Sequence, residues 1–204
     1  NHLNNPMDAG FDFMTTTTHK SMRGPRGGLI LTKKIHSKKI DSSIFPGLQG
    51  GPHMNQVAAT AVTMKKVASD EFEKYALNVL KNAKKLAKTL LDEGFKIVTG
   101  GTENHLIVIN TIDSVGIDGK ASEEILDSVG ITTNKQVVPD DPNPPLKPSG
   151  IRLGTPAITA RGMKEEDMIT IGKWISQVLK NKKNKDDLSR EIKNFSEKFN
   201  LPGI

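Results

Sequence analysis

The residues with the clearest chemical potential lie between Thr15 and Gly28, in the sequence TTTTHKSMRGPRGG. Four consecutive threonines favour an extended strand, and the glycines and proline that follow disfavour a helix. The pattern predicts a strand that delivers Lys20 into a loop. A histidine and two arginines flank this lysine in the sequence. Nearby positive charge and partial desolvation favour the neutral, nucleophilic form of a lysine amine, so we expect both to act on Lys20.

Such an amine suits a cofactor that carries an aldehyde. Pyridoxal 5'-phosphate combines an aldehyde with a phosphate, and glycine amides and arginine side chains are suitable partners for the phosphate. The same residues also fit an ordinary exposed lysine on a Gly-Pro turn. The spacing of these residues leaves both interpretations open.

Composition limits the class of protein. The chain has 204 residues, with 35% hydrophobic and 25% charged residues and no cysteine. No apolar run approaches the roughly 20 residues of a membrane span, and the opening NHLNNPMDAG lacks the regions of a signal peptide. Without cysteine there are no disulfides, thiolate nucleophiles or Cys-based zinc sites, which favours a reducing compartment. We predict a cytoplasmic globular protein, with neither a membrane partner nor a metal site.

The net charge of +6 does not by itself indicate nucleic-acid binding. The lysines are spread along the chain, and a single tryptophan and a single tyrosine provide little aromatic surface for base stacking. We therefore interpret most of the lysines as solvated surface residues.

The first part of the chain predicts strands and loops followed by helices. The strand-and-loop segments are residues 11–18, 27–34 and 42–52. Beyond Pro52, apolar residues recur at helical spacing as far as Gly94. This stretch is too long for one ordinary helix, so we expect a break near Ser69, which would cap the second helix.

Beyond Gly94, short strands alternate with helices, as in a small α/β domain. The predicted strands are residues 95–100, 105–112 and 131–138, and the predicted helices are residues 119–130, 164–179 and 186–199. The segment Pro139–Pro148 is rich in proline and can be neither a helix nor a central strand. We predict an ordered or exposed loop there.

Four segments of the chain, in this order, resemble motifs of serine hydroxymethyltransferases. They are TTTTHKSMRGPRGGLIL, IFPGLQGGPH, GGTENHL and SGIRLGTPAIT. The resemblance implies an α/β chain of the fold type I pyridoxal-phosphate-dependent transferases. Residues 1–69 would form the C-terminal part of the large cofactor-binding domain, and residues 70–204 the C-terminal small domain.

The resemblance assigns a role to each residue around the lysine. Lys20 would hold pyridoxal phosphate covalently, and His19 would lie beside it at the cofactor. Thr17 would assist the exchange of Lys20 for the amine of the substrate. Arg26 would stabilise the cofactor region electrostatically.

Further positions match residues that bind the cofactor and the amino acid. Gly50 and Gly51 correspond to glycines whose amides reach the phosphate of a cofactor held mainly by the neighbouring subunit, which implies a homodimer or tetramer. Arg152 corresponds to the arginine that binds the substrate carboxylate, and a planar guanidinium suits a carboxylate through two parallel hydrogen bonds.

The proline-rich segment resembles the region that contacts folate. Gln136, Asn143, Pro144 and Pro145 would contribute to the tetrahydrofolate site. The sequence departs from the family pattern here, because Gln136 stands where asparagine is common and Leu146 where phenylalanine is usual. These departures put the fit of the folate in doubt.

The implied activity is the reversible conversion of serine and tetrahydrofolate to glycine and 5,10-methylenetetrahydrofolate. In this family several cofactor-binding and catalytic residues precede the lysine by more than the nineteen residues available here. We therefore expect that a separate N-terminal half supplies them and that these residues alone are inactive. Two alternatives remain: a threonine aldolase-type enzyme with the same cofactor, and a non-catalytic basic binding fragment.

Overall fold

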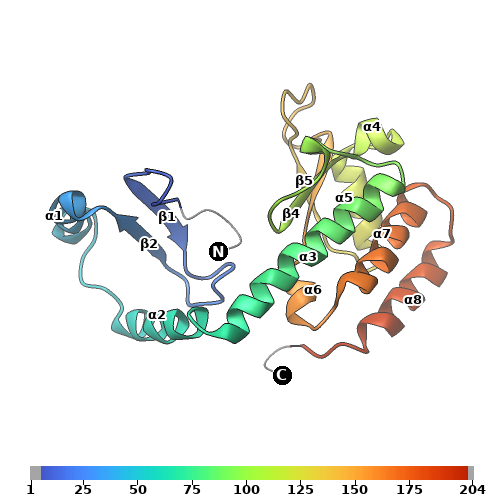
Figure 1. Ribbon diagram of the computed structural model, residues 1–204. Coiled ribbons are helices and arrows are strands. Elements are labelled where there is room, and N and C mark those ends of the chain that lie inside the picture. Colours follow the sequence, from blue (N-terminus) through green and yellow to red (C-terminus); the bar gives the residue numbers. More distant parts are fainter. Residues whose placement is uncertain (1–5, 202–204) are drawn as a thin grey trace. The chain divides into compact units, whose positions relative to one another are not determined.

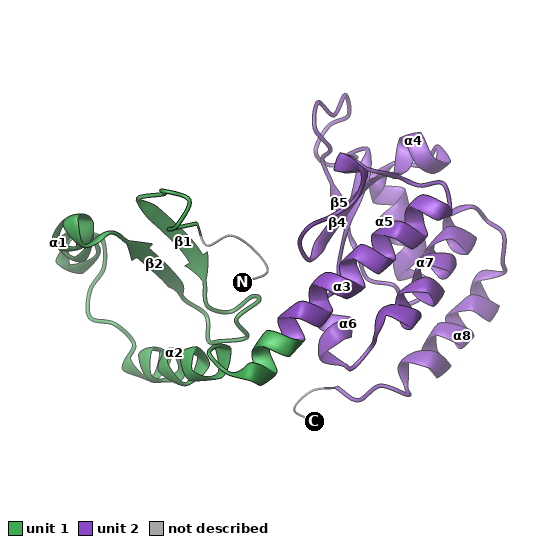
Figure 2. Ribbon diagram, viewed as in Figure 1, with its two compact units in different colours: residues 1–74 green, residues 75–204 purple. Residues whose placement is uncertain are grey.

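The structure, a computed structural model, describes residues 6–201 (Figure 1). The chain divides into two compact units, residues 1–74 and residues 75–204 (Figure 2). The division falls inside helix α3, Asp70–Asp92. The domain boundary predicted between residues 69 and 70 remains a prediction about the complete protein. Within the described residues, no helix is both long enough and apolar enough to cross a membrane.

Unit 1 is built on an antiparallel hairpin. Strand β1, Phe13–Thr17, pairs with β2, Gly28–Thr32, so that Phe13 faces Thr32 and Thr17 faces Gly28. Both strands were predicted and are confirmed. The hairpin is followed by a 3-10 turn, Lys34–His36, by α1, Ser37–Ser42, by a π-helical turn, Ser43–Leu48, and by α2, Met54–Val67.

The expectation of strand or loop over residues 42–52 is wrong for Ser43–Leu48. The β-branched and aromatic pair Ile44–Phe45 favours a strand locally. The sheet of unit 1 nevertheless has only β1 and β2 within the described residues, so this segment has no strand to pair with. Instead it continues the turns of α1, and the Oγ atom of Ser43 donates a hydrogen bond to the carbonyl of Lys39 at 2.7 Å.

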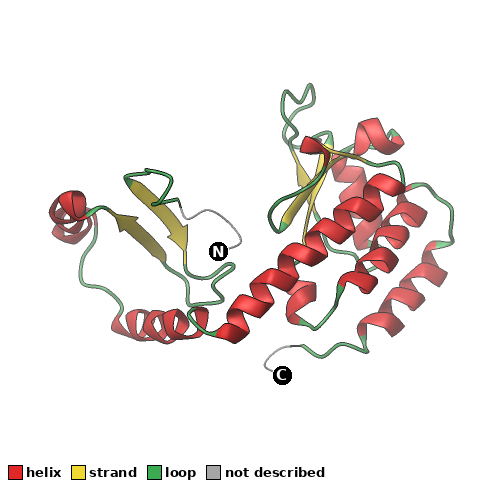
Figure 3. Ribbon diagram, viewed as in Figure 1, coloured by secondary structure: helices red, strands yellow, loops and turns green. Residues whose placement is uncertain are grey.

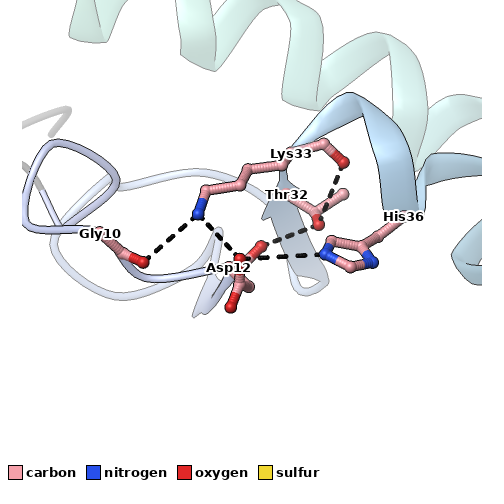
Figure 4. A network of polar contacts seen from close by, with 5 residues as sticks. All are labelled: Gly10, Asp12, Thr32, Lys33 and His36. Atoms are coloured by element: carbon pink, nitrogen blue, oxygen red, sulfur yellow. Dashed lines mark hydrogen bonds and ion pairs between the residues drawn. The ribbon is translucent and has the colours of Figure 1, made fainter.

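A polar network fastens the end of the hairpin at which β1 begins (Figure 4). The Nζ atom of Lys33 donates to the carboxylate of Asp12 at 2.8 Å and to the carbonyl of Gly10 at 3.4 Å. Thr32 donates to the carbonyl of Asp12 at 2.9 Å. The Lys33 ammonium lowers the pKa of Asp12 below its ordinary value. The network is exposed and lies at the opposite end of β1 from Lys20, so we assign it a local structural role.

Unit 1 buries very little apolar surface of its own. Thr18 and Thr63 are its only buried side chains among the described residues. Large apolar side chains are exposed instead: Phe11, Phe13, Ile30, Leu31, Ile35, Phe45, Leu48, Met54, Val57 and Val62. A two-stranded hairpin without a covered face is marginally stable in water, so burial within unit 1 contributes little to its stability.

Unit 2 contains a four-stranded antiparallel sheet in the order β3-β4-β6-β5. Its strands are β3, Lys96–Ile97, β4, Leu106–Asn110, β5, Asn134–Gln136, and β6, Gly150–Gly154. Its helices, besides most of α3, are α4, Thr111–Val115, α5, Gly119–Asp127, α6, Pro156–Ala160, α7, Glu165–Leu179, and α8, Lys185–Ser196. Figure 3 shows the helices and strands in separate colours.

The core of unit 2 lies between one face of this sheet and the helices. Alternate residues of the two central strands are buried, namely Ile107 and Ile109 of β4 and Ile151 and Leu153 of β6. They join one apolar cluster with residues of α3, α5, α7 and α8, including Leu90, Leu126, Met168, Ile175 and Leu188. The opposite face, here called the open face, carries the exposed Arg152 of β6 and the partly buried Leu106 and Val108 of β4.

One predicted cap is confirmed, and three predicted strands need correction. The strand predicted over 95–100 shrinks to Lys96–Ile97 and is followed by a 3-10 turn, Val98–Gly100. The Oγ atom of Ser69 accepts the N–H of Phe72 at 3.3 Å, which confirms the cap, although α2 already ends at Val67. The strand predicted over 105–112 ends at Asn110, because the Asn110 side chain caps α4. The strand predicted over 131–138 shrinks to Asn134–Gln136, the only part that pairs with β6.

Candidate functional site

The lysine loop follows β1 and is held closed by one buried residue, Thr18. The Oγ1 atom of Thr18 donates to the carbonyl of Pro25 at 2.6 Å, and its N–H donates to the carbonyl of Gly27 at 3.1 Å. Its carbonyl accepts the N–H of Gly24 at 2.8 Å. A Cβ on Gly24 would lie 2.8 Å from that carbonyl oxygen and 2.9 Å from a methyl group of Thr63. Glycine is therefore required for the loop to close on Thr18.

Lys20 lies in the middle of this loop, and its carbonyl accepts the N–H of Arg23 at 2.9 Å. Arg23 has a φ of 58°, a left-handed conformation that non-glycine residues adopt only at tight turns. The side chain of Lys20 is exposed. Among the described residues, the desolvation that we expected for its amine is therefore not observed.

His19 precedes Lys20 and is partly buried. Its Nδ1 atom is inaccessible to solvent and has no hydrogen-bond partner among the described residues. A buried nitrogen without a hydrogen-bond partner is costly and uncommon in folded proteins, so it marks this histidine as a candidate site residue. Thr17 ends β1 and is also partly buried. The structure therefore places Thr17, His19 and Lys20 together where the strand enters the loop.

Arg26, Gly50 and Gly51 line an open pocket of unit 1. This pocket has a volume of about 490 Å³, and Gln49 and His53 also contribute to it. Within the described part of the chain, a Cβ on Gly50 or Gly51 would meet no atom within 4 Å. The glycine backbone therefore has free space on its Cβ side, in a pocket that Arg26 also lines, and an arginine with open glycine backbone suits an anion.

The structure thus separates the predicted cofactor residues of unit 1 into two groups. Arg26, Gly50 and Gly51 share the pocket, and Lys20 and His19 do not line it. Thr18 connects the groups, because it lines the pocket and also holds the loop that carries Lys20.

Arg152 lies on the open face of the sheet of unit 2. It occupies the centre of β6 between the buried residues Ile151 and Leu153, so its side chain points away from the core and is exposed. It is opposite Asn134 of β5, and its Nη2 atom donates to the Oδ1 atom of Asn134 at 3.4 Å. Gln136 is two residues further along β5 and shares this face. Antiparallel pairing therefore places Arg152, predicted to bind the substrate carboxylate, on the same face as Gln136, predicted to bind folate.

His105 lies just before β4 and is influenced by Arg152. Partial burial lowers the pKa of His105 below its ordinary value, and the positive charge of Arg152 lowers it further. Within the described residues, no group of three or more His, Cys, Asp or Glu side chains could hold a metal ion.

The proline-rich segment joins β5 to β6 as a loop without regular structure, as predicted, and extends beyond the sheet in Figure 3. Pro144, Pro145 and Leu146 are exposed within it. Asn143 is partly buried, and its Nδ2 atom donates to the Oγ atom of Ser149 at 2.8 Å. The Nε2 atom of Gln136 donates to the carbonyl of Val137 at 3.0 Å. Of the predicted folate residues, Asn143 is thus fixed to the start of β6, whereas Gln136 has only a local bond.

Three structurally important residues escaped the sequence analysis. Thr18 was treated only as part of the threonine run, although alternation along a strand could have marked one threonine as buried. Asn134 meets Arg152 only through strand pairing, which the sequence does not reveal. Asp141 lies in the segment predicted to be a loop and was given no role of its own, yet it accepts hydrogen bonds from several parts of the proline-rich loop.

Comparison with known protein families assigns the chain to a family. Residues 1–175 match the family described as Serine hydroxymethyltransferase. The match includes the lysine loop, the glycine pair, the proline-rich loop and β6. The chain therefore belongs to the serine hydroxymethyltransferase family and has the α/β, fold type I architecture of pyridoxal-phosphate-dependent transferases.

Proposed function

We propose that this chain contributes the lysine, carboxylate-binding and folate-binding residues of an enzyme that interconverts serine and glycine with tetrahydrofolate as the one-carbon acceptor. The observation that carries the proposal is the lysine loop. Thr18 fixes its backbone, Lys20 presents an accessible amine, and the buried Nδ1 atom of His19 lacks a partner among the described residues.

These residues fit pyridoxal phosphate. When bound, this cofactor stabilises negative charge that develops on the α-carbon of an amino acid. Lys20 would anchor it through its amine, and His19 would lie beside it at the cofactor. Arg26 and the open backbone at Gly50 and Gly51 would bind phosphate oxygens, in line with the cationic and glycine-lined pocket. Thr17 would assist the exchange of the Lys20 amine for the amine of the substrate.

The substrate amino acid would be held by Arg152. Asn134 accepts one N–H of its guanidinium and so limits the rotation of the side chain on the open sheet face. The other guanidinium N–H groups would bind both oxygens of the serine carboxylate. Tetrahydrofolate would lie against the proline-rich loop, where Gln136, Asn143, Pro144 and Pro145 are its proposed contacts.

The proposal includes partners. Unit 1 has almost no buried side chains of its own, so the proposed enzyme needs further polypeptide over its exposed apolar surface. We propose the N-terminal half of the same enzyme and a second subunit, in a homodimer or a tetramer, and a cytoplasmic location. The 204 residues alone would then be inactive.

The test is to assemble the chain with that N-terminal half and pyridoxal phosphate. Borohydride reduction followed by peptide mass spectrometry should find the cofactor on Lys20, and serine should be converted only when tetrahydrofolate is present. Lys20→Arg should abolish both results, whereas the control Lys34→Arg, at an exposed lysine of unit 1, should leave them unchanged. Cofactor labelling at another lysine, or full turnover by Lys20→Arg, would show that the proposal is wrong.

The same assay distinguishes the proposed enzyme from a threonine aldolase-type enzyme. A threonine aldolase-type enzyme would cleave β-hydroxy amino acids at the same rate with and without tetrahydrofolate. The exposed Leu146, at a position where the family usually has phenylalanine, is the observation in its favour. Activity that depends on tetrahydrofolate would exclude this alternative.

A further inference from the structure

The carboxylate of Asp141 gathers the two ends of the proline-rich loop. Its Oδ2 atom accepts the N–H of Val138 at 3.2 Å and the N–H of Ser149 at 2.9 Å. Its Oδ1 atom accepts the N–H of Asn143 at 3.0 Å and the Oγ–H of Ser149 at 2.6 Å. Four donors from the beginning, middle and end of the loop thus converge on one side chain.

This arrangement fixes the orientation of Asn143. The hydroxyl of Ser149 has a single proton, which it donates to Asp141, so it can only accept from its second neighbour. That neighbour is the side-chain amide of Asn143 at 2.8 Å, which must present its Nδ2 atom. The Oδ1 atom of Asn143 then has no hydrogen-bond partner among the described residues and is left to meet a ligand.

The start of β6 is anchored separately. The carbonyl of Ser149 accepts from the N–H of Thr111 at 2.9 Å, from the Thr111 hydroxyl at 3.1 Å and from the N–H of Ile112 at 3.2 Å. The carbonyl of Pro148 accepts the N–H of Gly119 at 2.6 Å. These bonds hold the strand that carries Arg152, and none of them involves Asp141.

We propose that Asp141 is a positioning residue for the folate site: through Ser149 it presents the Oδ1 atom of Asn143 as a hydrogen-bond acceptor for tetrahydrofolate. This rests on the proposed function of the chain. Since β6 keeps its own anchors, loss of Asp141 displaces the folate contact and spares the amino-acid contact at Arg152. The two substrates therefore respond differently to a change at this position.

The test uses Asp141→Asn in the assembled enzyme. In one orientation the new NH₂ group faces the N–H groups of Val138 and Ser149, and both hydrogen bonds are lost. In the other it faces the N–H of Asn143, and the hydrogen bond with the Ser149 hydroxyl reverses, so that this hydroxyl donates to Asn143 and no longer fixes its Nδ2 atom. The KM for tetrahydrofolate should rise about tenfold or more, equivalent to about 1.4 kcal/mol of lost binding, while the KM for serine stays within about twofold. Ser149→Ala should likewise raise the KM for tetrahydrofolate and leave the KM for serine nearly unchanged, because it removes the hydroxyl that anchors Asn143.

Asp140→Asn is the matched control. This substitution removes the same charge at the adjacent position. Asp140 is exposed, and its side chain makes no hydrogen bond to any other described residue. Its φ of 53° is a conformation that asparagine adopts readily. The control should leave both KM values unchanged. An effect of Asp140→Asn equal to that of Asp141→Asn would mean that charge alone matters, and would overturn the proposal.

Hydrogen exchange gives a measurement that does not depend on turnover. In Asp141→Asn the amides of Val138, Asn143 and Ser149 should exchange faster, with those of Thr111 and Ile112 unchanged. Unchanged exchange, an unchanged KM for tetrahydrofolate, or an equal rise in both KM values would overturn the proposal while leaving the proposed function intact. Failure of the unsubstituted enzyme to bind tetrahydrofolate would refute the proposed function and this inference together.

Discussion

Gly119→Ala tests the packing that supports the start of β6. Gly119 is the first residue of α5 and is buried. A Cβ there would lie 2.0 Å from the carbonyl oxygen of Gly150 and 2.9 Å from that of Pro148. Both obstacles are backbone atoms, so the substitution cannot be relieved by rotating a side chain. Helix α5 and the end of the proline-rich loop would have to separate.

The sign of the effect follows from comparing three contributions. Alanine gains up to about 1 kcal/mol of helix propensity over glycine, and less at a first helical position. Overpacking costs about 1–3 kcal/mol, and the hydrogen bond from Gly119 to Pro148 contributes about 1 kcal/mol that separation would remove. We expect a net destabilisation of about 1–3 kcal/mol.

Urea denaturation followed by tryptophan fluorescence measures this change. Trp174 is the only tryptophan of the chain and is buried in unit 2, so its emission reports the unit that contains the substitution. The control is Gly101→Ala, where the backbone is extended and a Cβ would meet no described atom within 4 Å. An unfolding free energy of Gly119→Ala equal to or above that of the unsubstituted protein would refute the packing argument.

Three further predictions concern unit 2. The buried Asn82 side chain donates to Thr159 at 2.8 Å and to a backbone carbonyl at 2.9 Å, so Asn82→Ala should lower the unfolding free energy by about 2–3 kcal/mol, whereas Asn78→Ala on the exposed side of α3 should change it little. The Ser149 hydroxyl and three backbone N–H groups donate hydrogen bonds to Asp141 and lower its pKa far below the ordinary value. The contribution of ionised Asp141 to stability is therefore complete above the pKa of the unfolded state, and it is lost only as pH falls through the lower pKa of the folded state. The loop amides bound to Asp141 should therefore remain protected from hydrogen exchange at about pH 4, where an ordinary aspartate is half protonated, and loss of protection there would contradict this. Arg152→Met removes a positive charge that lowers the pKa of His105, so an NMR titration should show that pKa rising while it remains below the ordinary value, because burial is the larger cause.

Local sequence patterns predicted the elements whose cause is local. The threonine run, the helical spacing beyond Pro52 and the Ser69 cap depend on residues a few positions apart, and all three are confirmed. The same holds for the end of the helix near Gly130, whose φ is 87°. Glycine adopts this conformation without the steric cost that other residues pay.

The remaining features depend on partners distant in the sequence. Asn134 meets Arg152 only because β5 pairs with β6. The importance of Asp141 arises from a serine eight residues away, across a loop whose course the sequence does not specify. The expectation of a strand-and-loop segment over residues 42–52 is wrong at Ser43–Leu48 for the related reason that a strand needs a neighbour to pair with. Lys20 was identified from its motif, whereas its exposure could be learned only from the structure.

The scarcity of buried side chains among the described residues of unit 1 has a practical consequence for making this protein. Exposed apolar surface on a newly synthesised chain is bound by chaperones and promotes aggregation and proteolysis. Produced without companions, the chain should lose its leading third to limited digestion, whereas the well-packed remainder should survive as a discrete fragment. Co-production with the polypeptide that covers this surface is therefore the route to material on which the chemistry of the lysine loop can be measured.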